Sequence, residues 1–346
     1  MDLTVLSKIE LLAKCKELGL ENYKSKNKSG LIELIIENTT THQTIPQEIK
    51  NTIIQYQNPT CSSVAIRILS KTLISPSSPT VFYHNPHLKP LIKWSGGKSD
   101  EIKMFEKHFP EHYTTYIEPF VGGGAVYFYL NPKNAVISDV HTELIDLYTS
   151  IGKGNGTGIF EFMQNSPNDE NTYYHIRDNM EIMDELDSAK RFYYQRKTCF
   201  RGMLRYNKNG KFNIPFGKYK TINYSELLNK SYETLLSKTT ILNKDFEYIF
   251  ENYNDENHFM FLDPPYDSEF TDYGYCQFGK EEQKKLADAF KNTKIKCLMI
   301  IGKTKFIEEL YEGFIVDEYE KKYKFKLYNN RIGDEINTKH LIIKNY

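Results

Sequence analysis

The sequence contains few cysteines, one tryptophan, no net charge and no long apolar run. Its five cysteines lie far apart and form no C-x-x-C pair, so neither a disulfide framework nor a zinc site is indicated and reduced thiols are expected. No apolar run approaches the ~18 residues that a membrane span needs. The start, Met1-Asp2-Leu3-Thr4, lacks the basic and apolar stretch of a secretory signal. We therefore expect an intracellular, cytoplasmic protein that requires neither a membrane nor a metal.

Charge is balanced overall but clustered locally. The chain has 45 Lys and Arg against 45 Asp and Glu, so its total field will not steer it onto nucleic acid. Between Arg191 and Lys220, however, there are nine Lys or Arg residues and no acidic one. A solvated basic helix face is the ordinary explanation of such a run. Interleaved aromatic residues favour a nucleic-acid surface, because base stacking and phosphate contact usually occur together; they are Phe192, Tyr193, Tyr194, Phe200, Tyr206 and Phe212.

The chain divides into three regions by pattern. Residues 1–40 predict two short helices with apolar residues at 3.6-residue spacing, joined by a basic loop. Residues 41–87, rich in Ser, Thr, Asn, Gln and Pro, predict a linker. In residues 88–346, short apolar strands alternate with amphipathic helices, which predicts an α/β domain with a mostly parallel sheet. The expected strands are 116–117, 135–138, 240–242, 259–262, 297–301 and 340–344.

A glycine-rich turn follows the first expected strand. The run Glu118-Pro119-Phe120-Val121-Gly122-Gly123-Gly124 precedes a helix, and glycines there let the backbone approach a ligand closely. A tight turn without a ligand is the plain alternative. Asp139, fifteen residues after Gly124 at the end of the next strand, is suited to accept hydrogen bonds from ribose hydroxyls. The combination indicates a cofactor that contains a nucleoside. It implies no pyrophosphate, since G-x-G-x-x-G is absent.

The run Lys93-Trp94-Ser95-Gly96-Gly97-Lys98-Ser99 is superficially like a phosphate-binding P-loop. That motif requires a glycine five residues before Gly97, where this chain has Ile92. Phosphate binding is therefore rejected. Trp94, the only tryptophan, is explained most simply as an anchor at the edge of the core.

The most specific segment is Asp263-Pro264-Pro265-Tyr266, at the end of a buried strand. Two prolines fix the backbone and remove two N–H donors. The Asp263 carboxylate and the Pro264 carbonyl are then expected to accept hydrogen bonds from one exocyclic amino group. This draws its nitrogen toward sp³ geometry and frees the lone pair to attack a sulfonium methyl. Tyr266 is expected to stack on a base flipped out of the helix. A plain Pro-Pro kink is the alternative.

These segments together resemble the Dam-like, class alpha DNA adenine N6-methyltransferases. The resemblance spans about residues 88–346 and rests on "LIKWSGGKSDEI", "YIEPFVGGGAVYF", "ILNKDFEYI" and "FLDPPY", with a recognition region between the second and third. It implies a Rossmann-like S-adenosylmethionine-dependent methyltransferase fold: a mixed, mostly parallel sheet, an antiparallel C-terminal hairpin and a target-recognition insert, mainly helical with a hairpin, at about 155–235. "LLAKCKELGLENYKSKNKSGLIELI" resembles a SAP-type DNA-binding module; an ordinary helical hairpin packed on the main domain is the alternative.

The resemblance also assigns the expected site residues. Asp263, Pro264, Pro265 and Tyr266 are implied to be catalytic and to hold the target base. The implied contacts of the cofactor, S-adenosylmethionine, are Trp94 and Lys98 at its methionine end, Glu118, Pro119, Phe120, Gly122 and Gly124 around it, Asp139 at the ribose, Asp245 and Phe246 at the adenine, and Asp263. The implied DNA contacts are Lys197, Phe200 as an inserted aromatic, Arg201, Arg205 as a guanine reader, Asn207 and Pro215.

Three segments depart from the family pattern. Arg201 stands where Asn is usual, Gly302-Lys303 where Ser-Asn often follows the late strand, and His340 where an acidic residue is common. The first two departures affect the expected target sequence more than the chemistry.

The expected function is site-specific methylation of adenine N6 in double-stranded DNA, within GATC or a related short site. Three alternatives remain open at this point: a cytosine N4 methyltransferase, an RNA or protein-amide methyltransferase, and an inactive DNA-binding protein. The sequence also leaves open the oligomeric state, an accompanying restriction endonuclease, and whether the location is a host cytoplasm or a virion.

Overall fold

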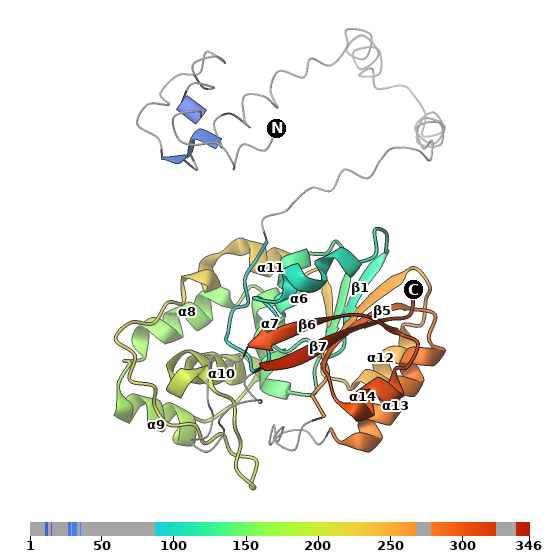
Figure 1. Cartoon of the computed structure of the whole chain (residues 1–346). Coiled ribbons are helices and arrows are strands. Elements are labelled where there is room, and N and C mark those ends of the chain that lie inside the picture. The colour runs from blue at the N-terminus through green and yellow to red at the C-terminus, as the bar shows by residue number, and fades with distance from the viewer. Residues whose placement is uncertain are drawn as a thin grey trace, which may run out of the picture. The chain divides into compact units, whose positions relative to one another are not determined.

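The computed structural model describes residues 87–267, 278–322 and 337–346, together with residues 11, 12, 15, 27, 28, 30–32 and 35 near the N-terminus. The chain forms two compact units, Met1–Phe82 and Tyr83–Tyr346 (Figure 1). The expected linker, up to residue 86, lies outside the described residues. In the part of the chain that is described, no helix combines the length and the apolar character needed to cross a bilayer.

The N-terminal unit contains a small apolar cluster. Leu11 and Cys15 from one helical segment and Leu31 and Ile35 from another are all buried in it. The side chain of Asn27 accepts a hydrogen bond from the Gly30 N–H at 2.9 Å, as a helix-capping residue does. Two packed helical segments are thus present where two helices are predicted. The remainder of the SAP-like assignment falls on residues outside those described, and it stays a prediction.

In the second unit, the described residues form a seven-stranded sheet. Its order is β3-β2-β1-β4-β5-β7-β6. Strands β1 to β5 pair in parallel, and β7 runs antiparallel to both β5 and β6. The bounds are β1 Thr115–Glu118, β2 Ala135–Ser138, β3 Thr239–Leu242, β4 His258–Leu262, β5 Lys296–Gly302, β6 Ile315–Lys322 and β7 Asn337–Lys344.

The predicted strands all form, and the C-terminal hairpin is antiparallel as expected. β6 was missing from the strands predicted individually, because five of its eight residues are charged. It lies at the edge of the sheet and pairs with β7 alone among the named strands. An edge strand with charged side chains resists pairing with other chains.

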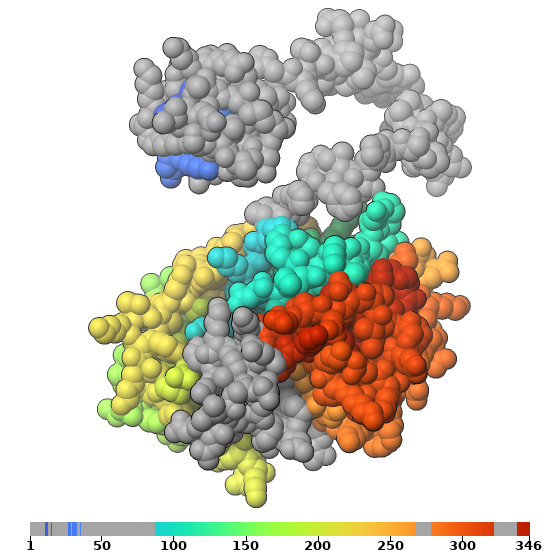
Figure 2. Space-filling view, viewed as in Figure 1, coloured from blue at the N-terminus to red at the C-terminus, as the bar shows by residue number. Residues whose placement is uncertain are grey.

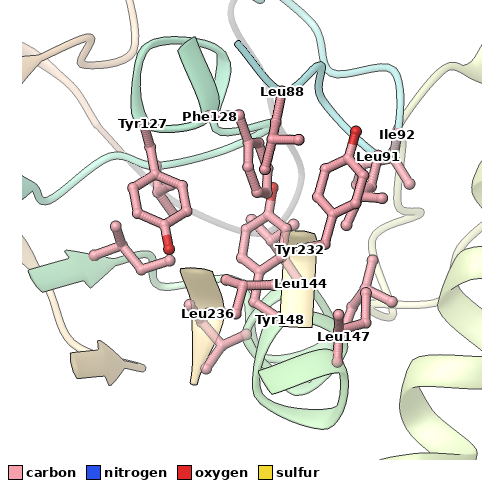
Figure 3. Packing of buried hydrophobic residues seen from close by; sticks show 14 of the residues in the cluster. Leu88, Leu91, Ile92, Tyr127, Phe128, Leu144, Leu147, Tyr148, Tyr232 and Leu236 are labelled. Atoms are coloured by element: carbon pink, nitrogen blue, oxygen red, sulfur yellow. The ribbon is translucent and has the colours of Figure 1, made fainter. Parts of the chain in front are cut away.

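Helices cover both faces of the sheet. In β4, Phe259 and Phe261 belong to one apolar cluster, whereas Met260 and Leu262 belong to the other, as the two-residue period of a strand requires. Helices on the first face include α6 Ala125–Leu130, α7 Thr142–Gly152 and α11 Lys230–Leu236, whose packing Figure 3 shows. Those on the second are α12 Phe246–Asn252, α13 Lys280–Asn292 and α14 Lys305–Leu310 (Figure 1). α5 Ile102–Phe105 and η1 Glu106–His108 precede β1.

A helical region with a hairpin lies between α7 and α11. Its helices are α8 Gly156–Asn165, α9 Glu170–Asn179, α10 Glu185–Thr198, η2 Phe200–Gly202 and η3 Ser225–Leu228. The hairpin, residues 199–217, is held by the bridges Cys199↔Phe216 and Tyr206↔Phe212. Drawn in yellow-green, it projects from the unit (Figures 1 and 2). We call it the recognition hairpin.

The sheet order reverses its direction between β1 and β4. At such a point the connections leave toward opposite faces, and a crevice opens outside the carboxyl ends of the strands. The glycine-rich turn follows β1 and the Asp-Pro-Pro-Tyr segment follows β4. The fold therefore brings the two most informative motifs of the sequence to one edge of the sheet.

Candidate active site

The glycine-rich turn connects β1 to α6 in a left-handed backbone conformation. Gly122 has φ 45° and Gly124 has φ 67°, values that favour glycine. A Cβ atom on Gly122 would lie 2.6 Å from the Trp94 ring nitrogen. Trp94 is thus the group that approaches this backbone. The glycines are required for this packing, and a ligand role for the turn remains a prediction.

Glu118, at the end of β1, is a buried carboxyl group. One of its oxygens accepts hydrogen bonds from the Tyr116 hydroxyl at 2.7 Å and the Tyr127 N–H at 3.1 Å. Burial raises the pKa of Glu118 to about 8. The group is therefore mostly protonated at neutral pH. The adjacent Pro119 is buried as well.

Asp139 ties the ends of β1 and β2 together. Its two oxygens accept the N–H groups of Gly122 at 3.0 Å and His141 at 2.9 Å. Burial raises the pKa of Asp139 to about 6. The carboxyl group thus fixes two turns, and each oxygen retains a lone pair for a further donor.

A polar hollow of about 500 Å³ opens beside the end of β2. Asp245 is one of its residues and caps α12, accepting the Tyr248 N–H at 3.0 Å. Phe246 is buried and stacks on Phe120, with ring centroids 5.7 Å apart. The hollow is lined by Val140, Asn243, Lys244, Asp245, Glu247, Tyr248 and Glu251. Most of its lining side chains are polar or charged.

Asp263 follows β4 and is paired with a buried lysine. The Lys98 ammonium donates to both carboxylate oxygens at 2.6 Å and to the Gly96 carbonyl at 2.8 Å. Lys98 is 2% exposed and the Asp263 side chain 21%. The same ammonium lies 5.2 Å from the centre of the Tyr266 ring. Two motifs more than 160 residues apart thus meet at one ion pair.

The Pro-Pro-Tyr loop is held from several elements. The Pro265 carbonyl accepts a hydrogen bond from the Gln283 side chain of α13 at 2.7 Å. The Tyr266 ring packs edge-on against His340 of β7, with centroids 5.3 Å apart. A Cβ atom on Gly302 of β5 would lie 3.2 Å from this ring. Two departures from the family pattern, Gly302 and His340, therefore both contact Tyr266.

A second buried polar cluster adjoins the pair, and sequence reasoning missed it. The Glu101 carboxylate accepts from the Tyr319 hydroxyl at 2.7 Å, lies 2.8 Å from His340 Nδ1 and is bonded by Lys321. The pKa of Glu101 is lowered to about 2: burial raises it, but the bonds from His340, Lys321 and Tyr319 and the Lys98 charge prevail. Glu101 and His340 are separated by 239 positions, so no local pattern could have joined them.

The recognition hairpin exposes an aromatic residue and an arginine at its base. Phe200 is 41% exposed, and its N–H donates to the Pro215 carbonyl at 2.8 Å. Arg201 has φ 56°, a left-handed value that Asn or Gly adopts more readily. Its guanidinium lies 5.1 Å from the centre of the Phe200 ring.

Arg205 and Asn207 lie farther along the hairpin. The exposed Arg205 donates from Nε to the Asn213 side chain at 2.8 Å across the hairpin. The Asn207 side chain accepts the N–H groups of Asn209 and Lys211 at 2.9 and 3.0 Å, so it shapes the turn. The structure brings Phe200, Arg201, Arg205, Asn207 and Pro215 into one hairpin.

Some cations of the basic run Arg191–Lys220 make structural contacts within the second unit. Arg196 is buried and donates to the carbonyls of Lys93, Gly202 and Met203. Arg191 is paired with Glu143 at 2.8 Å. Lys197 is directed toward the Leu91 carbonyl and the Tyr193 ring, and its role as a DNA contact stays a prediction. The exposed cations of the run are Arg201, Arg205, Lys208, Lys211, Lys218 and Lys220.

The described residues contain no group of three or more His, Cys, Asp or Glu side chains placed to hold a metal ion.

The sheet with its antiparallel β7 between β5 and β6, and the two motifs at its switch point, define the class as an α/β, Rossmann-like methyltransferase fold. Residues 94–327 match the D12 class N6 adenine-specific DNA methyltransferases. The chain belongs to this family. It is an adenine-specific DNA methyltransferase, which removes the cytosine, RNA and protein-amide alternatives.

Three relatives illustrate the similarity. The Type II methyltransferase M.CviBI of Paramecium bursaria Chlorella virus NC1A is 58% identical over 261 residues, 75% of this chain and 100% of that protein. The Type II methyltransferase M.MjaIII of Methanocaldococcus jannaschii is 31% identical over 75% of this chain and 99% of its own length. The DNA adenine methylase of Haemophilus influenzae is 33% identical over 66% and 85%, respectively.

Proposed function

We propose that this chain transfers a methyl group from S-adenosylmethionine to N6 of an adenine flipped out of double-stranded DNA, within GATC or a related short site. The observation that carries the proposal is the Asp263 carboxylate, which follows β4 as the glycine-rich turn follows the neighbouring strand β1. Family membership supports adenine as the base and a methyl donor as the second substrate.

Asp263 and Pro264 act on the target amine in this proposal. The Asp263 carboxylate and the Pro264 carbonyl accept its two N–H groups, and the nitrogen lone pair is then directed at the methyl carbon. The N6–C bond forms as the S–C bond breaks, and the nitrogen afterwards releases one proton. Tyr266, held by His340 and Gly302, stacks on the flipped base.

The cofactor occupies the hollow beside β2 and the turn after β1. S-adenosylmethionine, when bound, supplies a methyl group on a sulfonium centre. Asp245 contacts the adenine of the cofactor, and Asp139 accepts hydrogen bonds from its ribose. The segment from Glu118 to Gly124 lies along the remainder of the cofactor. The polar lining of the hollow and the acceptors of Asp139 support this fit.

The recognition hairpin binds the duplex. Phe200 enters the base stack, Arg205 contacts guanine and the remaining exposed cations contact phosphates. The exposure of Phe200, Arg201 and Arg205 supports this arrangement. In the N-terminal unit, residues 1–40 act as a second DNA-binding module on the linker 41–87. A restriction endonuclease as a functional partner is also proposed, since relatives are named Type II methyltransferases.

The test is methyl transfer from labelled S-adenosylmethionine to unmethylated duplex DNA, followed by mapping of the labelled bases. Asp263→Ala should abolish transfer, whereas DNA affinity should survive because phosphate contacts dominate it. Asp267→Ala, four residues along in the same loop, is the matched control and should retain activity. Normal turnover by Asp263→Ala on saturating DNA would refute the assigned role.

A further inference from the structure

The ion pair between Lys98 and Asp263 differs from the surface pairs of this chain. Its ammonium is 2% exposed, whereas the Lys103–Glu106 pair nearby has side chains 74% and 32% exposed. Both Asp263 oxygens lie 2.6 Å from Lys98 Nζ, and the Gly96 carbonyl satisfies a third ammonium N–H. The geometry is that of a cation built to hold one carboxylate.

An ammonium in this place determines the charge of the carboxyl group. Burial raises the pKa of Asp263, and Lys98, by its charge and its hydrogen bonds, is the main opposing influence. The neighbouring Glu101 carboxylate adds to the need for a cation, since like charges favour protonation. The titratable and charged groups of the described residues that surround Asp263 are Lys98 and Glu101 before α5, Glu118 of β1, Tyr266 in its own loop, Tyr319 and Lys321 of β6, and His340 of β7.

We propose that Lys98 is a positioning residue for methyl transfer: by bonding both oxygens, its ammonium keeps Asp263 ionised and oriented for the target amine. The proposal rests on the proposed function, in which Asp263 accepts a hydrogen bond from that amine. A protonated Asp263 would donate its O–H toward the amine lone pair and block attack. The ionised group retains lone pairs for the amine while Lys98 stays bound. This role differs from the contact with the methionine end of the cofactor that the family resemblance implies.

The test compares Lys98→Met and Lys98→Arg with the wild type. Single-turnover methyl transfer is measured with saturating labelled S-adenosylmethionine and duplex DNA from about pH 5.5 to about 9, which brackets the titration of a raised carboxyl group. Lys103→Met, which removes an exposed lysine of α5, is the control for the loss of a nearby positive charge. Cofactor affinity is measured for each variant by calorimetry.

Loss of the ammonium should move the acid limb of the pH–rate profile, which is the pH range in which the rate rises with pH. The ionised form is active, so activity falls as pH falls through the pKa of Asp263; without Lys98 this pKa rises. We expect Lys98→Met to shift the limb upward by roughly 1–3 pH units and to recover most of its rate at alkaline pH. Lys98→Arg and Lys103→Met should keep the wild-type limb. An unshifted limb in Lys98→Met, with or without weakened cofactor affinity, would overturn the proposal.

Two further measurements distinguish failure of the Lys98 proposal from failure of the proposed function. Activity of Asp263→Asn at the wild-type rate would refute the proposed function of Asp263 itself, whatever Lys98 does. If Lys98→Met does not fold, carbon NMR of aspartate-labelled wild-type protein reads the Asp263 carboxyl group directly, with the resonance assigned from Asp263→Asn. An ionised carboxylate at neutral pH is expected, and a protonated one would overturn the proposal.

Discussion

Three carboxyl groups at the carboxyl edge of the sheet are held by different donors. Glu118 accepts a hydroxyl and a backbone N–H, Asp139 accepts two backbone N–H groups, and Asp263 accepts a lysine ammonium. Burial raises the pKa of all three. A neutral donor satisfies a protonated or an ionised carboxyl group, whereas an ammonium favours the ionised one. The structure thus supplies a cation to the group that the proposed mechanism requires to be charged.

The buried Glu118 makes stability depend on pH. Its pKa is raised to about 8 in the folded chain, above the unfolded value, so its contribution is complete at acid pH and is lost as pH rises through about 8. Glu118→Gln retains an acceptor for Tyr116 and Tyr127 without a charge to bury. We expect this variant to gain stability over the wild type between pH 5 and 9, on the order of a few kcal/mol.

Denaturant unfolding at the two ends of that pH range measures the difference. Glu111→Gln, at an exposed position, is the control and should show almost none. A Glu118→Gln effect that is independent of pH would contradict the proposed charge state.

At the scale of elements, the recognition hairpin is anchored through Tyr206, whereas Arg205 and Lys208 beside it are exposed. Tyr206 lies 2.6 Å from His141 Nε2 and donates to Glu143 at 3.0 Å. Glu143 also binds Arg191 of α10. These bonds attach the hairpin to the start of α7, which directly follows Asp139 and His141. Because the hairpin is held rigidly, its exposed DNA-contacting side chains lose less conformational entropy when DNA binds.

Substitution of Arg205 tests whether this hairpin recognises a DNA base directly. A bidentate pair with guanine O6 and N7 is the commonest specific major-groove contact, and the Arg205 side chain is exposed, bonded to Asn213. Arg205→Ala should cost ~1–3 kcal/mol of discrimination and relax the choice at one base. Methylation mapped across a random-sequence library measures this preference.

Lys208→Ala, at an exposed position in the same hairpin, is the matched comparison. Loss of a phosphate contact should weaken binding to all sequences alike and lower the slope of log affinity against log salt concentration by about one. The same uniform behaviour in Arg205→Ala would show that Arg205 neutralises phosphate instead. Arg201, in its left-handed conformation, is the residue we expect to make the site differ from GATC.

At the scale of the whole chain, the family match over residues 94–327 lies within the unit Tyr83–Tyr346. M.CviBI aligns over its full length with 75% of this chain, and the chain divides into compact units near residue 82. The N-terminal unit has a small apolar cluster of its own. A tethered second DNA-binding module adds avidity by raising the local concentration of its partner.

Deletion of residues 1–40 should therefore leave methylation of short duplexes nearly unchanged and weaken binding to long DNA. Gel-shift titrations on duplexes of two lengths, with single-turnover rates on the shorter one, separate the two effects. A variant that is insoluble or inactive on the short duplex would instead make this segment part of the methyltransferase core.

The sequence alone determined the strands of the described sheet other than β6, the glycine-rich turn and the Asp-Pro-Pro-Tyr segment. These features are local: apolar runs such as 259–262 specify a buried strand, and the two prolines fix the backbone after Asp263 whatever surrounds them. Their order along the chain sufficed for the family, which the comparison confirms.

Tertiary structure decided which of these local features lie in contact, because its contacts join residues far apart in the sequence, which no helix or strand periodicity relates. It paired Lys98 with Asp263, placed Trp94 on the glycine turn and buried Arg196 of the basic run. It also built the cluster of Glu101 and His340 across 239 positions. Buried charges must find partners wherever the fold supplies them, so the electrostatics of the site follow from the packing of the whole unit.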